Sequence, residues 1–237
     1  MSSLAIIVPC FNEEKRLDTL AFSQFAQLHQ HIKIVFVNDG SSDKTLSVIK
    51  DIIACHANME LLNFSRNVGK GEAVRQGLIH AVKSQSFDFI GYLDADLSAS
   101  LEEFHDIYKY ALEKKADFIF GSRIKKLGSV IRRSHLRHII GRILVTVIDK
   151  KFQLGYYDTQ CGAKVFKSTL LQNILQQPFF TKWFFDIEIF LRLKAENKNY
   201  SGIEYPLKTW ENKKGSKINL LSFPVISKEI FVLLSKY

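Results

Sequence analysis

The run IVFVNDGSSDKT, residues 34–45, joins a strand to a helix. Its first four residues are β-branched or aromatic, which is typical of a buried strand. The next three residues, Asn-Asp-Gly, are turn formers. Ser41, Ser42 and Asp43 then supply the side chains that cap helix N-termini. The run therefore predicts one strand, turn and helix unit of an α/β fold.

The same unit recurs through the first half of the chain. Alternation of β-rich runs with helical patterns is typical of a mostly parallel sheet flanked by helices, with right-handed crossovers. We expect strands at Ala5–Val8, Ile34–Val37, Glu60–Phe64, Phe89–Leu93 and Asp117–Phe120, and helices at Glu13–Gln30, Lys44–Ala57, Gly71–Ser84 and Leu101–Lys114. With 237 residues and 46% hydrophobic content, the chain is predicted to form a single domain.

The cysteines and the apolar stretches indicate in which compartment of the cell the protein is found. Three cysteines, at positions 10, 55 and 161, form no close pair, and isolated thiols indicate a reducing compartment. The apolar start of the chain ends at Pro9 and has no basic residue before it, so we expect no signal peptide. The stretch 218–237 is interrupted by Pro224, Lys228 and Glu229, short of the roughly 20 apolar residues that a spanning helix needs. We expect a cytoplasmic protein.

Positive charge is concentrated between Gly121 and Lys151. This segment holds nine basic residues and one acid, out of a net charge of +9. Its partner should be anionic, and nucleic acid, an acidic lipid surface and a phosphorylated substrate fit equally well. Apolar residues recur every three or four positions from Leu136 to Val147, which predicts an amphipathic basic helix. That helix either packs on the core or faces a membrane or acceptor. Nucleic acid is disfavoured because no series of aromatics lies between the arginines.

Two acidic residues follow a predicted buried strand directly. Asp94 and Asp96 come just after Phe89–Leu93, and ligands of α/β sheets bind beyond the carboxyl ends of the strands. Hard oxygen ligands in this position suit Mg²⁺ or Mn²⁺ bridging a diphosphate. Such a metal would act as a Lewis acid on a leaving nucleotide.

Two other strand ends carry candidate ligand residues. Asp39 could accept hydrogen bonds from a nucleotide base or ribose, or could instead shape its turn. The loop Ser65–Gly71 combines glycines with Lys70 ahead of a predicted helix. It matches neither the Walker phosphate loop nor the dinucleotide-binding motif. Donor contact and simple loop geometry both remain open for it.

The chain carries eight short motifs in order: PCFNE (9–13), VNDGSSDKT (37–45), NVGKG (67–71), DADLS (94–98), GSR (121–123), DTQCGAKVF (158–166), WFFDIE (183–188) and GSK (215–217). Taken in this order, they resemble the motifs of family 2 inverting glycosyltransferases. The last three are similar to those of the branch that includes dolichyl-phosphate β-glucosyltransferase and dolichyl-phosphate mannose synthase.

The resemblance implies a GT-A fold, a nucleoside-diphosphate sugar donor and a divalent metal, Mg²⁺ or Mn²⁺. It divides the single domain 1–237 into a donor half, 1–123, and an acceptor half, 124–237. The implied donor-site residues are Pro9, Asn12, Glu13, Asp39, Lys70 and Asp94, with Asp96 as the principal metal ligand beside Asp94.

The resemblance also assigns residues around the acceptor. Arg123 is expected at a donor or acceptor phosphate, where a bidentate cation fits. Asp186 and Glu188 fall where relatives place the acid that deprotonates an acceptor hydroxyl. A phosphate acceptor would need no such base. The expected acceptor-binding residues are Arg132, Arg133, Arg137, Asp158, Thr159, Gln160 and Gly162.

These observations predict transfer of a hexose, with inversion, from a UDP-sugar to a polyprenyl phosphate. GDP is the less favoured nucleotide. A saccharide or glycolipid hydroxyl is the alternative acceptor, and a non-catalytic nucleotide-sugar-binding protein is the alternative of another class. We expect peripheral contact with an anionic membrane at its inner face. The basic segment and the apolar residues of the C-terminal stretch would make that contact.

Overall fold

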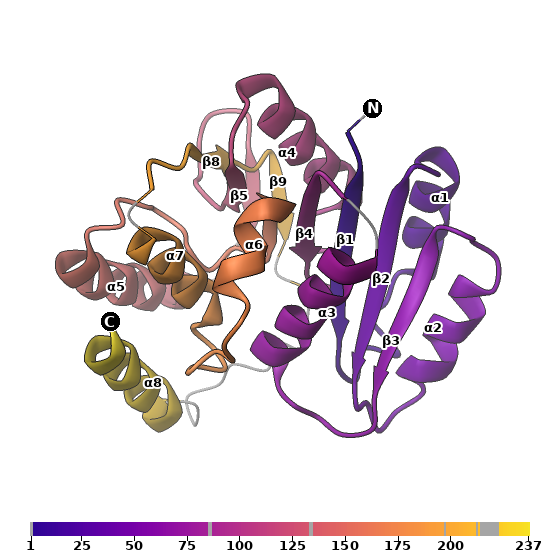
Figure 1. Ribbon diagram of the computed structural model, residues 1–237, viewed down its shortest axis with the longest axis horizontal. Helices are drawn as coiled ribbons and strands as arrows, with labels where there is room; N and C mark the ends of the chain where they lie inside the picture. Colours follow the sequence, from indigo (N-terminus) through magenta and orange to yellow (C-terminus); the bar gives the residue numbers. More distant parts are fainter. Residues whose placement is uncertain (1, 85–86, 133–134, 197, 212, 214–222) are drawn as a thin grey trace.

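The computed structural model describes residues 2–84, 87–132, 135–196, 198–211, 213 and 223–237. They form one seven-stranded sheet in the order β3-β2-β1-β4-β7-β5-β8, with helices on both faces (Figure 1). The strands are β1 Leu4–Cys10, β2 Ile32–Asp39, β3 Met59–Phe64, β4 Phe89–Leu93, β5 Phe118–Ser122, β7 Ala163–Lys167 and β8 Gly202–Pro206. The described part of the chain is therefore a single α/β domain.

Alternating side chains of the strands build two cores. In β1, Leu4, Ile6 and Val8 face one core while Ala5 and Ile7 face the other, as the two-residue period of a strand requires. The first core is covered by α1 Thr19–Leu28, α2 Thr45–Ile53 and α4 Leu101–Lys114. The second is covered by α3 Lys70–Ser84, α6 Ser168–Ile174 and α7 Phe185–Ala195. Both faces of the sheet are thus buried, which accounts for the continuous apolar runs in the sequence.

The five predicted strands and four predicted helices are present, Phe89–Leu93 and Leu101–Lys114 with the predicted bounds and the others with shifted ends. The largest shift is in the first helix, which was expected from Glu13 and begins only at Thr19. Asp18 caps it by accepting a hydrogen bond from the Ala21 amide at 3.0 Å. The Glu13 amide instead donates to Thr45 Oγ1 at 2.7 Å. The residues before Asp18 therefore belong to a turn that ties the ends of two strands together.

One strand of the sheet runs against the others. β7 lies between β4 and β5 and is antiparallel to both, whereas β5 pairs with β8 in parallel. The start of β7, and not its end, therefore lies beside the carboxyl end of β4. Because β5 pairs only with strands from the second half of the chain, the division at residue 123 cuts through one sheet.

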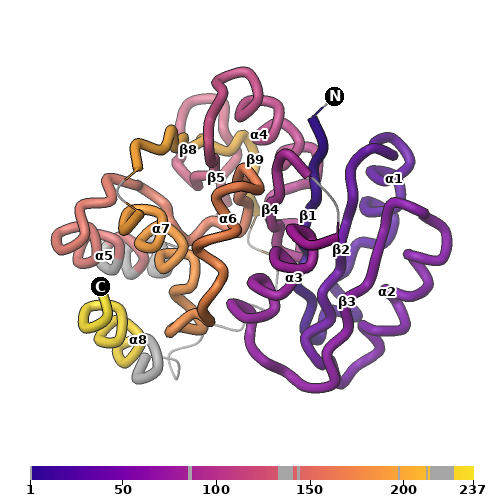
Figure 2. Tube along the Cα trace, in the orientation of Figure 1, coloured from indigo at the N-terminus to yellow at the C-terminus, as the bar shows by residue number. Residues whose placement is uncertain are grey.

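A second, two-stranded parallel sheet pairs β6 Val130–Arg132 with β9 Thr209–Glu211. Beyond it, α5 His135–Phe152 confirms the predicted helix. Its last turns pack on the core, because Ile148 and Phe152 are buried against α7 and against α8 Phe223–Lys236. Figure 2 traces the same path, with α8 beside α5 and α7. No helix among the described residues is long and apolar enough to span a membrane.

A cluster of histidines joins α1 to α4. The His29 and His105 rings are 4.3 Å apart, and His31 lies 6.1 Å from His29. Burial, and then the neighbouring His29, lowers the pKa of His105 to about 4. Burial, and then His31, lowers the pKa of His29 as well. The folded state therefore holds the imidazoles of His29 and His105 neutral at neutral pH.

The free energy of unfolding should fall as the pH drops from about 6.5 toward 4. An unfolded histidine takes up its proton near pH 6.5, while folded His105 resists protonation down to about 4, so acid favours the unfolded chain. His105→Gln should reduce the loss of stability between neutral and mildly acidic buffer, measured by urea unfolding. His56→Gln, outside the cluster, is the control. An unchanged pH dependence in His105→Gln would contradict this.

Candidate active site at the carboxyl ends of the strands

Hydrogen bonds between loops join the ends of β1 and β2. The Asn12 amide donates to Ser41 Oγ at 3.0 Å, and the Ser42 amide donates to Asn12 Oδ1 at 2.9 Å. Asn12 adopts a positive φ of 52° to reach across. Glu13 is buried and paired with Arg16, and Pro9 lies in β1 opposite Val37. The structure thus brings the predicted donor residues of both strand ends together.

Asp39 organises the next loop. It is 2% exposed, and its carboxylate accepts hydrogen bonds from the Val68 amide at 2.7 Å, the Gly69 amide at 3.0 Å and Asn67 Nδ2 at 2.9 Å. A methyl group in place of a hydrogen on Gly40 would lie 2.3 Å from the Arg66 carbonyl carbon, so the two loops pack backbone to backbone. Asp39 therefore acts on the loop that carries Lys70, more than on its own turn.

Lys70 lies among the aspartates that were predicted to bind metal. Its ammonium is 2.6 Å from Asp94 Oδ1. Burial opposes its charge, but Asp94, followed by Asp186 and Asp96, raises the pKa of Lys70 above its ordinary value. Asp96 Oδ1 accepts a hydrogen bond from the Ser98 amide at 3.0 Å, which orients that carboxylate. The site is therefore already built to hold a cation against Asp94.

The two aspartates fit a divalent metal that is shared with a substrate. No set of three or more His, Cys, Asp or Glu side chains in the described ranges is arranged to hold a metal ion. Mg²⁺ is commonly held by one or two carboxylates together with substrate phosphates and water. Asp94 and Asp96 supply two carboxylates. The ion pair between Asp94 and the Lys70 ammonium shows that a cation is accommodated at Asp94. A metal would have to displace Lys70 from Asp94 or share the carboxylate with it.

The antiparallel β7 brings the predicted acceptor loop to Asp94. The Asp94 amide donates to the Gly162 carbonyl at 3.0 Å. A methyl group on Gly162 would lie 2.1 Å from Asp94 Oδ2, so only glycine allows this approach. Within the described chain, Thr159 Oγ1 and Gln160 Nε2 are buried polar atoms without a hydrogen-bond partner. Buried polar atoms are rarely left unpaired, so a ligand at this loop would satisfy them.

Arg123 and Asp158, expected to contact ligands separately, bind each other. Arg123 Nε and Nη2 donate to the two oxygens of Asp158 at 2.6 and 2.7 Å, and the Arg123 amide adds a bond of 3.0 Å. Burial opposes the charge, but Asp158 raises the pKa of Arg123 further above its ordinary value. The guanidinium also lies over the Trp210 ring at 5.3 Å. Arg123 is thus held in an internal ion pair, and its contact with a donor or acceptor phosphate stays a prediction.

Asp186 lies near the site but is committed to internal partners. Its Oδ1 accepts from Lys164 Nζ at 2.5 Å and from the Tyr92 hydroxyl. Lys164 is 0% exposed and donates also to the Cys161 carbonyl at 2.5 Å. Burial, and then Asp186, raises the pKa of Tyr92 well above its ordinary value. The role of Asp186 as a free base finds no support in this geometry.

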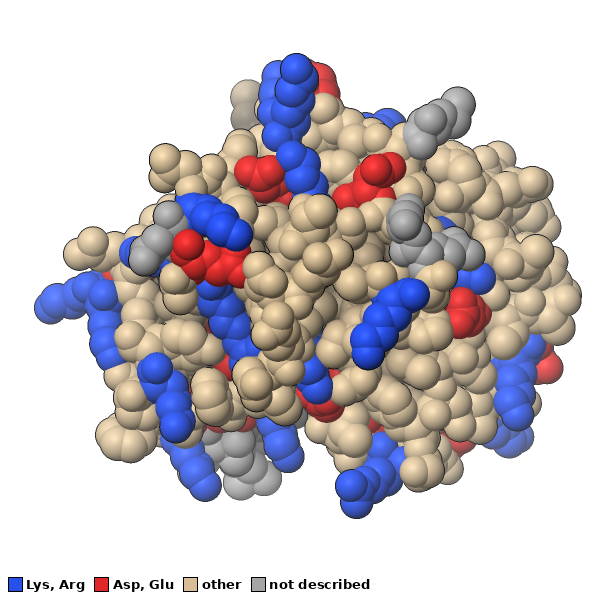
Figure 3. Space-filling model, in the orientation of Figure 1, with Lys and Arg blue, Asp and Glu red and all other residues tan. Residues whose placement is uncertain are grey.

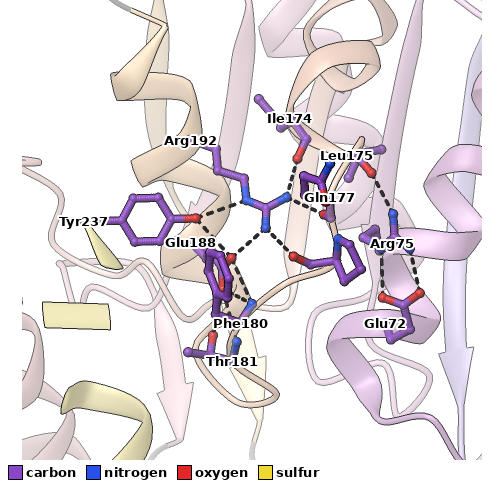
Figure 4. Close-up of polar contacts among 11 residues, drawn as sticks. Glu72, Arg75, Ile174, Leu175, Gln177, Phe180, Thr181, Glu188, Arg192 and Tyr237 are labelled. Atoms are coloured by element: carbon purple, nitrogen blue, oxygen red, sulfur yellow. Dashed lines mark hydrogen bonds and ion pairs between the residues drawn. The ribbon is translucent and has the colours of Figure 1, made fainter. Parts of the chain in front are cut away.

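Glu188 is surrounded by hydrogen-bond donors of a turn, of α7 and of Tyr237, away from Lys70 and Asp94. It is 0% exposed, and its carboxylate accepts from the Phe180 and Thr181 amides, the Tyr237 hydroxyl and Arg192 Nη2, the last at 2.7 Å. Figure 4 shows Arg192 between Glu188, Tyr237 and the carbonyls at the end of α6. The expectation that Glu188 deprotonates an acceptor is not supported, because its oxygens hold a turn and a helix together.

A groove beside the loop that follows Asp96 is lined by one of the expected acceptor residues, Arg132. It has a volume of about 340 Å³ and lies between Leu97 and Ser98 on one side and Arg132 and Trp210 on the other. The side chain of Arg132 is 71% exposed and 3.3 Å from Glu211. Of the other two predicted arginines, Arg133 lies outside the described residues, and for Arg137 only the backbone, in α5, is described.

The substitution Gly162→Ala tests the coupling of this loop to the predicted metal site. The added methyl must move the Asp94 carboxylate, and disturbing the support of a metal ligand typically costs about 10- to 100-fold in affinity. We expect binding of Mn²⁺ with UDP, followed by calorimetry, to weaken by about tenfold or more. Gly202→Ala crowds the Phe118 ring at 2.2 Å and serves as the control at the far edge of the sheet. Equal affinities in the two variants would refute the coupling.

Comparisons with known proteins agree with this geometry. Residues 5–175 match the family described as Glycosyl transferase family 2. The chain is 30% identical over 230 residues to dolichyl-phosphate beta-glucosyltransferase ALG5D of Trichomonas vaginalis, covering 92% of this chain and 68% of that protein. It is 27% identical over 260 residues to the dolichyl-phosphate beta-glucosyltransferase of Saccharomyces cerevisiae, covering 99% and 75%.

A solved structure shares the fold. Glucosyl-3-phosphoglycerate synthase from Mycobacterium tuberculosis, in complex with Mn²⁺, uridine diphosphate and phosphoglyceric acid, superposes with a TM-score of 0.70 at 15% identity. The match covers 98% of this chain and 77% of that one. The fold is therefore GT-A, as expected, and the chain belongs to glycosyl transferase family 2.

Proposed function

We propose that this chain transfers a hexose from UDP-glucose or a similar UDP-sugar to a polyprenyl phosphate, with inversion. The choice of acceptor rests on one observation: the carboxylates of both candidate bases are already hydrogen-bonded to other groups of the protein. Asp186 is bonded to Lys164 and Tyr92, and Glu188 to a turn and Arg192. An acceptor phosphate is anionic at neutral pH and needs no base. The dolichyl-phosphate glucosyltransferases to which the chain is similar support the same choice.

In this proposal the residues at the strand ends share the work of binding and charge stabilisation. Asp94 and Asp96 would hold Mg²⁺ or Mn²⁺, which would stabilise the charge on the leaving diphosphate. The Asp39 carboxylate fixes the loop 67–69, and so places Lys70 where its ammonium would meet the same phosphates. Thr159 and Gln160 would supply the polar atoms that orient the sugar or the acceptor headgroup.

The groove beside Asp96 is the proposed seat of the acceptor headgroup. Arg132 supplies exposed positive charge there, and Trp210 an apolar wall. The groove continues directly from the metal-binding loop, because Leu97 and Ser98 follow Asp96 in the chain.

The decisive experiment is a transfer assay with UDP- and GDP-sugars, Mg²⁺ or Mn²⁺, and short polyprenyl phosphates, with products identified by mass. A glycosyl phospholipid product is expected. Asp96→Asn and chelation should each lower the rate by about a hundredfold or more, since removal of one electrostatic stabiliser has that effect. Full activity in EDTA would exclude the metal role. Transfer only to saccharide hydroxyls would replace the acceptor, and binding without turnover would favour a non-catalytic nucleotide-sugar-binding protein.

The proposal includes a cytoplasmic enzyme that lies on the inner face of a membrane. Leu127 is fully exposed at the tip of the loop that leads from Arg123 to β6, and Val130 is 53% exposed. Lys125 and Lys126 beside it are exposed. An apolar tip flanked by lysines is suited to an anionic bilayer. Figure 3 shows other lysines and arginines scattered between acids over the drawn face, not gathered in one patch.

Lys125→Ala/Lys126→Ala should weaken binding to anionic liposomes by about 10- to 30-fold, because each basic residue near such a surface contributes about 1 kcal/mol. The apparent KM for a polyprenyl phosphate in vesicles should rise, while the affinity for UDP stays unchanged. Lys50→Ala/Lys83→Ala removes the same charge from exposed positions of α2 and α3 and is the control. Sedimentation that is equal for both double variants would overturn the membrane contact through this loop.

A further inference from the structure

The C-terminal helix α8 is attached to α7 by a buried carboxylate. Glu229 is 8% exposed. Its Oε1 accepts from the Lys182 amide at 3.1 Å, and its Oε2 accepts from the Trp183 amide at 2.8 Å and the Phe184 amide at 3.3 Å. Three successive backbone amides thus converge on one side chain, about 45 residues further along the chain.

These amides lie just before α7 and at its N-cap. Phe184 is the N-cap residue of α7, and its own side chain makes no capping hydrogen bond. The first amides of a helix have no partner within the helix, and their partial positive charge favours an anion nearby. Glu229 therefore holds the residues that lead into α7 and places a carboxylate at the N-terminus of that helix. Leu233, 0% exposed, packs α8 against the same part of α7.

The segment that Glu229 holds lies against the loop of Lys70. A methyl group on Gly71 would lie 2.9 Å from Phe185 Cβ, and one on Gly69 would lie 3.7 Å from Lys182 Cδ. The Lys70 ammonium is 5.9 Å from the centre of the Phe185 ring. The next residue, Asp186, is one of the carboxylates that raise the pKa of Lys70. The first turn of α7 and the residues just before it thus pack beside Lys70.

We propose that Glu229 is a positioning residue for donor binding. By binding the amides of residues 182–184 it fixes the segment 182–186 against the glycines on both sides of Lys70, and so sets the place of the Lys70 ammonium beside Asp94. Donor affinity then depends on the docking of the C-terminal helix, although no described contact joins α8 to Asp94 or Asp96. The inference rests on the proposed function only in that a nucleoside diphosphate binds at this site.

The test compares Glu229→Gln, Glu229→Ala and the conservative Glu229→Asp. The affinity for UDP and for GDP with Mn²⁺ is measured by calorimetry, and the tighter nucleotide is used throughout. We expect Glu229→Ala to weaken binding by about tenfold, as for a lost set of charged hydrogen bonds, with smaller losses for Gln and Asp. In assays, the donor KM should rise more than kcat falls. Glu113→Gln, an exposed glutamate bonded to Lys114, is the matched control.

Two further measurements separate positioning from a general loss of stability. Leu233→Ala weakens the docking of α8 without removing the hydrogen bonds of Glu229, so at an equal decrease in Tm it should weaken UDP binding less than Glu229→Ala. The chain has two tryptophans, and Trp210→Phe leaves Trp183 as the only one. Its emission should report a looser segment in Glu229→Ala. Unchanged nucleotide affinity in Glu229→Ala, or equal losses in both variants at matched Tm, would overturn the inference.

These outcomes are independent of the acceptor. If the protein binds UDP in a Glu229-dependent way but transfers nothing to a polyprenyl phosphate, the proposed acceptor fails and the positioning role stands. If transfer to a polyprenyl phosphate proceeds normally and the nucleotide affinity is the same with and without Glu229→Ala, the positioning role fails and the proposed function stands.

Discussion

The buried ion pair between Lys164 and Asp186 is the constraint on which the site depends. It joins β7 to α7, and through the Cys161 carbonyl it holds the turn that presses Gly162 against Asp94. Two charges withdrawn from water are costly, and removal of one partner of such a pair typically destabilises a protein by about 3–5 kcal/mol. The pair therefore gives less net stability than its short distance suggests, but it fixes one arrangement of three elements around Asp94.

The ends of the parallel strands were predictable because their determinants are local. The turn after β2 and the acidic pair after β4 each follow an apolar run that can be recognised as a strand from its composition. The structure brings these residues together. The antiparallel insertion of β7 was not predictable, because its five residues read like any short strand and its partners lie about 75 residues away for β4 and about 46 for β5. A strand's neighbours depend on long-range packing that no local pattern records.

The roles of the charged residues were harder to predict for a related reason. Arg123, Asp186 and Glu188 have the residue types that catalysis uses, and the sequence gives no view of their partners. Asp158 lies 35 positions from Arg123, and Lys164 lies 22 positions from Asp186. Both pairs are nearly closed to solvent, and buried charges need such partners. A charged residue in a motif can thus serve the architecture of a site without touching what binds there.

The place of β7 in the sheet has a consequence for synthesis on the ribosome. The first 123 residues contain β1 to β5, yet β4 and β5 are not neighbours and each waits for β7. While the ribosome makes residues 124–162, one edge of β4 and both edges of β5 lack the strands that cover them in the folded sheet. Open edges of this kind invite wrong pairing, either with each other or with another chain. A chaperone that shields the emerging half until β7 is translated would improve the yield of folded protein.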